Sequence, residues 1–440
     1  MSSNKVRVGI IGFGTVGTGV AKLLLEDAAA IQARTGLEIE LATVVDVDTK
    51  TARGVDLPEG MLTDDVDTLL KDETIDIGVE LVGGTTVAKD IQLKLLQAGK
   101  HVVTANKALL AEHGTELFKA AREANRSIAF EASCAGGIPI ISVIRTGLAA
   151  NRIDAIYGIL NGTCNYILSS MSKEGVDFPA ALLQAQEKGY AEADPTLDVN
   201  GSDSAHKLAI LSRLAFGCEI KLEQVWVEGI EDIQISDIRN GAEMGYVLKL
   251  LAIGERDKEG GISLRVHPAF ISKRNTLAHV DGPFNAISIF SHAVGNTMYL
   301  GRGAGMMATA SAVVADIIEI GSGSYQRVFK NVALEAPEKI GAIVKDIGTI
   351  NSRFYIRLMA KDQPGVVATY GKILGDHNIS ISGAIQHEGS GPDNTVPVVI
   401  TTHPTEQKNM SAALKELERL DVIGGKPICI RIVDIPEDKD

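Results

Sequence analysis

The sequence predicts an α/β protein with three parts: a doubly wound parallel sheet, an α+β region and a small C-terminal ferredoxin-like module. In the first 135 residues, short apolar strands alternate with helical segments. Glycine is abundant, at 45 of 440 residues, whereas aromatic residues make up only 4%, a balance common in α/β chains with many tight turns. Residues 352–436 follow the order strand, helix, strand, strand, helix, strand, which defines a split βαβ module.

The first strand is expected at 6–11, directly before the glycine loop Gly12-Phe13-Gly14-Thr15-Val16-Gly17. A helix over 15–33 and a strand over 39–45 that ends in Asp46 complete the fingerprint of a Rossmann-type dinucleotide-binding unit. Gly12 permits the tight turn, Gly14 lets the backbone approach a pyrophosphate, and Gly17 lets helix and strand pack closely. The free N–H groups at the start of the helix then face the phosphates.

The alternation continues through the rest of the first part. Expected strands cover 75–81, 101–107 and 127–132, and expected helices cover 87–98 and about 107–125. Ligands bind at the carboxyl ends of such strands, so Thr104 and Lys107 are expected near the nicotinamide end of the cofactor. We assign 1–135 to this dinucleotide-binding domain. A helix over 306–320 opens after a further glycine loop, and 306–325 is expected to pack back on this domain.

The middle part, 136–305, mixes strands and helices. The expected strands are 153–160, 225–233 and 262–266, and the expected helices are 165–172, 180–188 and 203–216. Residues 282–301 carry no formal charge but are interrupted by proline, asparagine and glycine, so we expect buried strands there rather than a membrane span.

An acidic loop within this middle part is the most informative stretch of the chain. Glu192, Asp194 and Asp198 lie in a proline- and glycine-punctuated loop before a helix that carries Asp203 and Lys207. Residues four apart on a helix share one face. The cluster therefore suits a small substrate with an ammonium group and a hydroxyl or carbonyl. Taken alone, it fits a solvated acidic loop with an ordinary helix salt bridge better than it fits a substrate site, and the surrounding motifs reverse that preference.

A linker at 326–351 is expected before the C-terminal module, 352–436. Its strands are expected at 353–360, 379–387, 396–402 and 427–435, with helices from about 366 to 377 and over 406–420. The module resembles an ACT domain, whose junction of the form Asp-x-Pro-Gly between strand and helix commonly binds a free amino acid. Here that junction is Asp362-Gln-Pro-Gly365.

The composition of the chain bears on its binding partners and on its location in the cell. The net charge of −13 disfavours nucleic acids and anionic membranes. The four cysteines show neither zinc-ligand spacing nor a disulfide framework, and the N-terminus is not a signal peptide, so a cytoplasmic location is expected.

Several motifs together resemble homoserine dehydrogenases, in family order and over nearly the whole chain. They are Gly12-Phe-Gly-Thr-Val-Gly17, Val103-Thr-Ala-Asn-Lys107, Phe130-Glu-Ala-Ser-Cys-Ala-Gly-Gly-Ile-Pro139, Leu160-Asn-Gly-Thr-Cys-Asn165, Lys188-Gly-Tyr-Ala-Glu-Ala-Asp-Pro195 and Gly201-Ser-Asp-Ser-Ala-His-Lys207. The resemblance implies interconversion of L-homoserine and L-aspartate 4-semialdehyde with NAD or NADP, in a homodimer or a larger homo-oligomer. It also implies feedback by an amino-acid effector, threonine, at the ACT module.

The resemblance assigns roles to the residues. Lys207 becomes the lysine that transfers the proton, with Lys107 as its companion and Asp203 on the reacting hydroxyl or on Lys207. Further residues are assigned to substrate, cofactor and cation. The substrate set is Glu192, Asp198, Tyr190, Gly162 and Thr163; the cofactor set adds Gly189 and Gly303 to the residues above; a structural monovalent cation (Na⁺ or K⁺) would involve Glu131, Cys134, Gly136 and Ile138.

The end of the second strand bears on cofactor choice. A carboxylate there, Asp46, hydrogen-bonds a ribose 2′-hydroxyl and repels a 2′-phosphate, and the nearest downstream arginine is Arg53. The sequence therefore predicts a preference for NAD, or relaxed use of both cofactors.

Three alternatives stay open. Cys134 or Cys164 would suggest covalent aldehyde chemistry, although neither has an obvious histidine partner in the sequence. A non-catalytic amino-acid sensor on a dehydrogenase scaffold is the alternative from another class of protein. Another amino-acid or hydroxy-acid dehydrogenase is the nearest enzymatic alternative.

Overall fold

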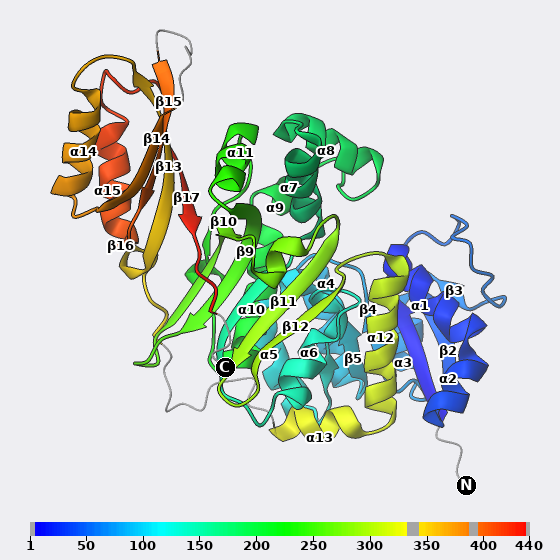
Figure 1. The fold of residues 1–440 in the computed structure, drawn as a ribbon. Helices are drawn as coiled ribbons and strands as arrows, with labels where there is room; N and C mark the ends of the chain where they lie inside the picture. The colour runs from blue at the N-terminus through cyan, green and yellow to red at the C-terminus, as the bar shows by residue number, and fades with distance from the viewer. Residues whose placement is uncertain (1–4, 332–342, 387–394, 437–440) are drawn as a thin grey trace. The chain divides into compact units, whose positions relative to one another are not determined.

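The computed structural model describes residues 5–331, 343–386 and 395–436. Its Cα trace divides into two compact units, each assembled from separate stretches of the chain (Figure 1). The first unit comprises residues 1–154, 206–224 and 285–342, and the second comprises 155–205, 225–284 and 343–440.

A parallel sheet forms the centre of the first unit, with strand order β3-β2-β1-β4-β5-β6. All of its pairings are parallel. Val8 and Ile10 on β1 and Ile77 and Val79 on β4 are fully buried, as expected for strands covered on both faces. The strands are β1 (Lys5–Ile11), β2 (Glu38–Val45), β3 (Leu62–Thr63), β4 (Ile77–Glu80), β5 (His101–Thr104) and β6 (Ile128–Ala129).

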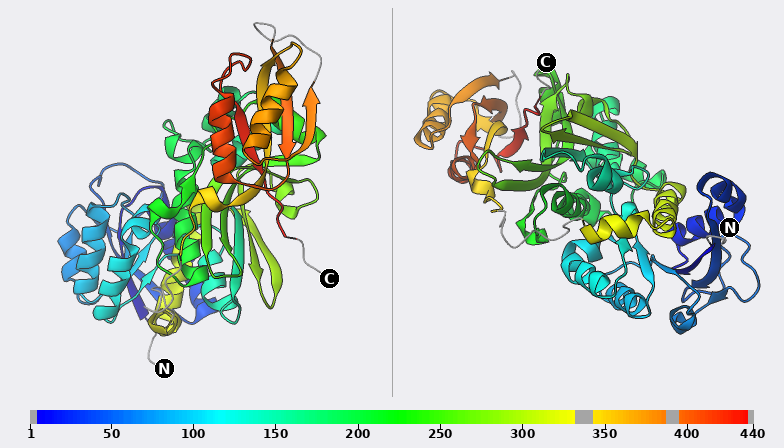
Figure 2. Two further views of the ribbon diagram at one scale, coloured as in Figure 1. Left: turned by 90° about the vertical axis from the view of Figure 1, so that its left-hand side faces the viewer. Right: turned by 90° about the horizontal axis from the view of Figure 1, so that it is seen from below.

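Helices cover this sheet. Helix α12 packs against α1, and the two lie side by side in Figures 1 and 2. Gly19 permits this close approach, because a Cβ atom there would lie 2.9 Å from Met306 and 3.0 Å from Ala310. The helices of the first unit include α1 (Thr15–Glu26), α2 (Ala28–Thr35), α3 (Val66–Lys71), α4 (Val87–Gln97), α5 (Lys107–Glu123), α6 (Ile140–Ser142), α12 (Met306–Gly321) and α13 (Ser324–Asn331).

Two expectations for the first unit are wrong in detail. The helix predicted over 15–33 breaks at Asp27, and α2 after it buries none of its residues, so no core contact extends α1. The strand predicted over 101–107 ends at Thr104. There the side chain of Asn106 accepts the N–H of Leu109 at 3.1 Å and starts α5, so Lys107 is the first residue of a helix.

The second unit is built on a mixed sheet with strand order β7-β9-β10-β17-β13-β15-β14. Strand β10 pairs antiparallel with β9 and parallel with β17, so the strands of the C-terminal module continue the sheet of the middle part. The strands are β7 (Ile153–Ile159), β8 (Trp226–Val227), β9 (Tyr246–Arg256), β10 (Ile262–Ser272), β13 (Asn351–Lys361), β14 (Ile381–Gln386), β15 (Thr395–Thr402), β16 (Thr405–Glu406) and β17 (Ile428–Ile432).

Some helices of the second unit begin at capping side chains. Asn161 caps α7 and Asp177 caps α8 by accepting backbone N–H groups of the first turn. The strand predicted over 225–233 is wrong beyond β8: the chain leaves the sheet and forms α11, which opens with a capping box of Gln234 and Asp237. These helices are α7 (Gly162–Glu174), α8 (Phe178–Glu187), α9 (Thr196–Val199), α10 (Ser202–Phe216, which continues into the first unit) and α11 (Ile235–Glu243).

The C-terminal module has the predicted order of strands and helices, with the short β16 added. Its two helices, α14 (Val366–Asp376) and α15 (Gln407–Leu417), lie on one face of β13, β15 and β17 (Figures 1 and 2). Their apolar faces meet a core that includes Ile356, Leu374, Ile400 and Leu417. Residues 387–394, between β14 and β15, lie outside the described residues. The predicted fold class is confirmed.

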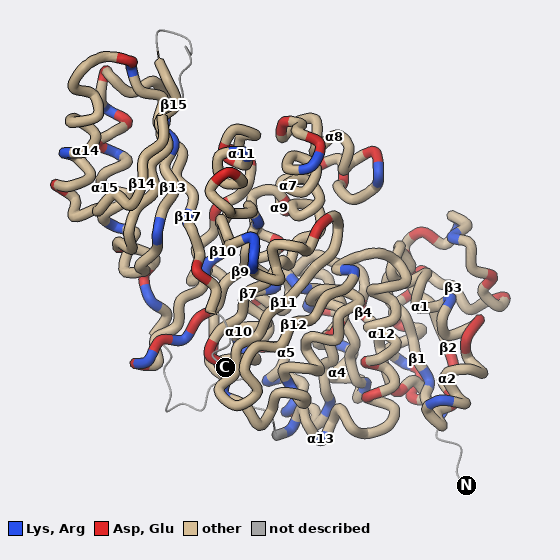
Figure 3. Tube along the Cα trace, viewed as in Figure 1, with Lys and Arg blue, Asp and Glu red and all other residues tan. Residues whose placement is uncertain are grey.

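The uncharged segment 282–301 forms two neighbouring strands, β11 (Phe284–Ser291) and β12 (Gly295–Arg302). Strand β11 is mostly buried, as expected, but the expectation of burial is wrong for β12, whose residues are half-buried or exposed. Within the described ranges no single helix is both long and apolar enough to cross a membrane; α12 and α13 pass that test only as a pair bent by 84°. Acidic and basic residues are interspersed along the trace in Figure 3.

Candidate functional site

The glycine loop after β1 has the shape that a dinucleotide requires. Gly12 has a φ of +101°, and a Cβ atom there would lie 2.7 Å from the backbone of Leu81. A Cβ atom on Gly17 would lie 2.1 Å from the carbonyl oxygen of Gly12. Gly14 precedes α1 without a side-chain cap, and no atom lies within 4 Å of the Cβ position there. The first N–H groups of α1 thus fit a pyrophosphate.

The end of β2 carries an ion pair rather than an isolated acid. The carboxylate of Asp46 accepts the N–H of Phe13 at 2.5 Å. The guanidinium group of Arg53 lies 3.4 Å from Asp46 and 3.3 Å from Asp48, and 5.3 Å from the centre of the Phe13 ring. The end of β2, where the sequence predicts contact with the ribose, therefore holds both signs of charge.

A buried carboxylate at the end of β4 organises the neighbouring strand ends. Glu80, fully buried, accepts hydrogen bonds from Thr104 Oγ1 and Gln92 Nε2, each at 2.8 Å, and from the N–H of Val82 at 2.9 Å. Thr104 is predicted to contact the cofactor. Its hydroxyl group donates a hydrogen bond to Glu80 and accepts one from the N–H of Asn106 at 3.0 Å. Sequence reasoning did not identify Glu80, although an acid that ends an apolar strand was the available signal.

The two predicted catalytic lysines both belong to the first unit. Lys107 starts α5, and Lys207 lies in α10 with 8% of its surface exposed. The backbone carbonyl of Lys207 lies 3.9 Å from the Sγ atom of Cys134. Asp203 is one turn before Lys207 on the same helix, so both residues share one face.

In the second unit, one buried amide connects two of the predicted acids. Asn161 Nδ2 donates to Asp198 Oδ1 at 2.7 Å and to Asp203 Oδ2 at 2.9 Å. Asn161 was not among the predicted site residues, and its place in the motif Leu160-Asn-Gly-Thr was the only signal for it. In the described part of this unit, Glu192 is exposed and stands outside this hydrogen-bonded group.

The remaining predicted substrate residues lie at the start of α7 and in the loop after α8. Gly162 is the first residue of α7, and Thr163 Oγ1 donates to the carbonyl of Tyr190 at 2.6 Å. The Tyr190 ring lies 4.9 Å from the Tyr166 ring and is 39% exposed. Gly189, beside it, is exposed and has a φ of +71°. The structure therefore brings Thr163 and Tyr190 together.

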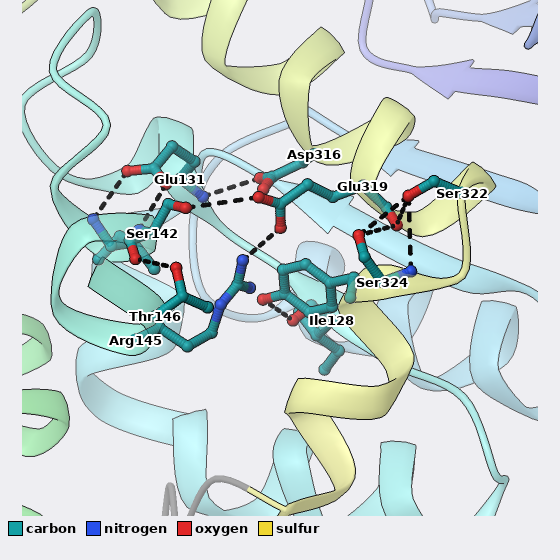
Figure 4. Close-up of polar contacts among 11 residues, drawn as sticks. Ile128, Glu131, Ser142, Arg145, Thr146, Asp316, Glu319, Ser322 and Ser324 are labelled. Atoms are coloured by element: carbon teal, nitrogen blue, oxygen red, sulfur yellow. Dashed lines mark hydrogen bonds and ion pairs between the residues drawn. The ribbon is translucent and has the colours of Figure 1, made fainter. Parts of the chain in front are cut away.

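The predicted cation residues lie near a buried acidic group of the first unit, drawn in Figure 4. The two oxygens of the Glu131 carboxylate accept the N–H groups of Ile141 and Ser142, each at 2.8 Å, and the N–H of Glu131 donates to Asp316. Burial raises the pKa of Glu131 to about 7, and burial next to Glu131 raises the pKa of Asp316 as well.

Glu131 therefore caps α6 with its side chain, which leaves backbone carbonyls as the donors for a cation. The following turn offers such carbonyls, because Ala135 and Gly136 adopt positive φ values of 55° and 44°. A Cβ atom on Gly136 would lie 2.6 Å from the carbonyl oxygen of Gly303, so these two glycines meet backbone to backbone. Among the described residues, no three His, Cys, Asp or Glu side chains are grouped for a metal ion. A carbonyl-bound monovalent cation is compatible with this arrangement.

Both cysteines considered for aldehyde chemistry are fully buried. Cys164 Sγ donates to the carbonyl of Asp198 at 3.2 Å, and Cys134 lies against Lys207 as described above. Each thiol thus packs against a predicted site residue and has no exposed surface from which to attack a substrate.

Comparisons with known proteins agree along the whole chain. The family models "Homoserine dehydrogenase, NAD binding domain", "Homoserine dehydrogenase" and "ACT domain" match residues 12–131, 139–318 and 354–422. The homoserine dehydrogenase of Neisseria gonorrhoeae is 42% identical over 427 residues, which cover 96% of this chain and 97% of the relative.

Solved structures of homoserine dehydrogenases are also similar to this chain. The crystal structure of a homoserine dehydrogenase from Thiobacillus denitrificans superposes with a TM-score of 0.90, at 41% identity and 98% coverage of both chains. A hyperthermophilic archaeal homoserine dehydrogenase mutant in complex with NADPH superposes with a TM-score of 0.61, at 28% identity, covering 72% of this chain and 97% of that one. The chain belongs to the homoserine dehydrogenase family of NAD(P)-dependent oxidoreductases.

Proposed function

We propose that the protein interconverts L-homoserine and L-aspartate 4-semialdehyde, in the biosynthesis of threonine, methionine and isoleucine. The carbinol C–H bond of homoserine breaks as hydride leaves for the nicotinamide ring, which the bound cofactor supplies. The hydroxyl proton must leave in the same step, so a proton acceptor has to lie beside that oxygen.

Lys207 is the proposed proton carrier. In the reducing direction its ammonium group donates a proton to the aldehyde oxygen, and in the oxidising direction the neutral amine accepts the hydroxyl proton. Asp203, one turn away, hydrogen-bonds the reacting oxygen or positions Lys207, and Lys107 contacts substrate and nicotinamide. Asp198 and Glu192 bind the substrate ammonium group, and Gly162, Thr163 and Tyr190 surround the substrate.

One observation carries this proposal: Asp198 and Asp203 are joined through a single buried amide, and Asp203 shares a helix face with the buried Lys207. The test is homoserine-dependent reduction of NAD and NADP by the full chain, with L-serine and L-malate as control substrates. Turnover with homoserine alone supports the proposal. Equal turnover with serine or malate would indicate a different dehydrogenase, and binding without turnover would indicate a sensor.

We propose a preference for NAD or relaxed use of both cofactors. Asp46 favours a ribose 2′-hydroxyl. Arg53, paired with Asp46 and Asp48 at the same strand end, is the cation available to a 2′-phosphate. A lower KM for NADPH than for NADH would contradict this preference.

A monovalent cation is proposed in the turn that contains Cys134, Gly136 and Ile138, beside Glu131. The test compares the melting temperature of the full chain in Na⁺, K⁺ and choline chloride at equal ionic strength. Higher melting temperatures in Na⁺ or K⁺ support the site, and equal temperatures in all three salts refute it.

Threonine is the proposed effector of the C-terminal module. The supporting feature is the turn Asp362-Gln-Pro-Gly365 between β13 and α14, where Gly365 precedes the helix with a φ of +90°. Threonine should inhibit the full chain, and Asp362→Ala should weaken inhibition while Lys372→Ala, an exposed change on α14, should not. Equal inhibition of all three proteins would refute the assignment.

A homodimer or larger homo-oligomer is also proposed. Strand β12 ends the strand order of its sheet, and an end strand presents backbone groups on its outer side that a second copy can pair with. Light scattering of the purified chain measures the oligomer, and a monomeric mass would exclude it.

All four cysteines are free, in keeping with a cytoplasmic location, which stays a prediction.

A further inference from the structure

The side chain of Asn161 holds two acids in one hydrogen-bonded group. It is 4% exposed and precedes α7 as the N-cap residue. Its Oδ1 atom accepts the N–H of Cys164 at 2.8 Å, which ties the oxygen end of the amide to the helix. The nitrogen end therefore faces the carboxylates, which accept hydrogen bonds but do not donate them when ionised.

Each hydrogen of the Nδ2 group has its own acceptor. One points to Asp198 Oδ1 at 2.7 Å and the other to Asp203 Oδ2 at 2.9 Å. Both geometries are those of strong amide–carboxylate hydrogen bonds. Because the two hydrogens of one amide diverge by a fixed angle, the two carboxylates are held at one spacing despite their like charge.

The same helix start also holds the backbone on which Asp198 lies. Cys164 Sγ donates to the carbonyl oxygen of Asp198 at 3.2 Å. Asp198 lies on the one-turn helix α9 and Asp203 on α10, so Asn161 and Cys164 together connect α7, α9 and α10. A short helix such as α9 has little packing of its own, with Val199 as its only buried residue.

We infer that Asn161 is a positioning residue for the reaction: it fixes Asp198 and Asp203 at the spacing that the substrate requires and offsets their mutual repulsion. This inference rests on the proposed function, in which these acids face the ammonium and hydroxyl ends of one amino alcohol. Asn161 acts through the two acids and does not itself exchange a proton. Its alternative role is to cap α7 and nothing more.

Asn161→Ser and Asn161→Asp separate these two roles. Serine and aspartate are both good N-cap residues, so each variant retains the cap of α7. Neither retains two N–H donors. Asn161→Asp also places a third carboxylate beside the other two, so its activity should fall more than that of Asn161→Ser, and more steeply as pH rises. Asp177→Ser on α8 is the matched control, since it exchanges one capping residue for another in the same unit.

We expect Asn161→Ser to lose kcat/KM for homoserine on the order of 100-fold, as misplaced reacting groups do, with most of the loss in kcat. Its KM for the nicotinamide cofactor and its melting temperature should stay close to those of the Asp177→Ser control. Wild-type turnover by Asn161→Ser would overturn the inference. If that variant does not fold, Asn161→Asp serves the same purpose, and its wild-type turnover has the same consequence.

A double-mutant cycle with Asp203→Asn separates the inference from the proposed function. Because Asn161 works through Asp203, adding Asn161→Ser to Asp203→Asn should cost far less than it costs in the wild-type chain. Additive losses would overturn the inference while Asp203 keeps its role. Full activity of Asp203→Asn alone would overturn the proposed role of Asp203 and the inference with it.

Discussion

Replacing Arg357 should destabilise the second unit strongly, because it would leave a buried charge alone. Arg357 on β13 contacts Asp237 on α11 through two hydrogen bonds, of 2.6 and 3.2 Å. The side-chain exposures are 8% and 0%. Tyr355 adds a hydrogen bond of 3.0 Å to the same carboxylate. This pair joins the C-terminal module to the middle part of the chain.

Removing one partner of a buried ion pair costs about 3–5 kcal/mol, since the other charge stays out of water. Arg357→Met keeps the apolar length of the side chain and removes the charge. At about 2–4 °C per kcal/mol for a unit of this size, the melting temperature should fall by about 10 °C. Calorimetry and urea unfolding of the full chain measure the loss.

Two further variants make the reasoning testable. Arg353→Met, on the same strand but with a side chain 28% exposed and 3.5 Å from Asp434, should cost less than about 1 kcal/mol. Adding Asp237→Asn to Arg357→Met removes the buried carboxylate that has lost its partner, and should restore most of the lost free energy of unfolding. If Arg357→Met were no more destabilising than Arg353→Met, the buried pair would not anchor the module.

Substitutions at His101 and at the Asp46–Arg53 pair should alter the pH dependence of stability and the choice of cofactor, respectively, because each changes a charged or titratable group. The N–H of Ser127 donates to His101 Nδ1 at 3.1 Å, and burial, with Arg126 nearby, lowers the pKa of His101 from 6.5 to about 4. Between pH 6.5 and pH 4 the unfolded state carries a proton on His101 that the folded state lacks. The free energy of unfolding therefore falls by about 3 kcal/mol as the pH is lowered across this range. His101→Gln should flatten the pH dependence of the unfolding free energy in that range, and an unchanged slope would refute this. Asp46→Ser should raise kcat/KM for NADPH relative to NADH by releasing Arg53, whereas Arg53→Ala should lower it; no change in either ratio would remove both residues from cofactor choice.

Much of the fold follows from local patterns, and the departures have local causes. The glycine loop, the strands of the parallel sheet other than the two-residue β3, and the order of the C-terminal module could be predicted, because each depends on short-range periodicity and turn residues. The helix break at Asp27 and the early end of β5 depend on capping and on missing core contacts, which single-sequence periodicity does not encode. Strand β9 and helix α11 were not predicted from the sequence, although β9 is largely buried and α11 opens with a capping box.

The candidate site shows the same division. Motifs pointed to Asp203 and Lys207, which are close in sequence, whereas the partners of these residues come from far along the chain. Asn161 is 42 residues from Asp203, and its role depends on which way one amide faces. The ion pair between Arg53 and Asp46 likewise requires a loop to fold back, so the sequence indicated both residues but not their contact. Tertiary contacts of this kind leave no periodic signal.

The most direct test of the account is the turnover of Lys207→Ala with homoserine, measured beside Lys221→Ala, an exposed lysine of the same unit. Loss of a positioned proton carrier should lower kcat by about 10²- to 10⁴-fold while the melting temperature and the KM for the cofactor change little. Lys221→Ala should retain full activity. A folded Lys207→Ala protein that reduces NAD or NADP at the wild-type rate would contradict the central claim.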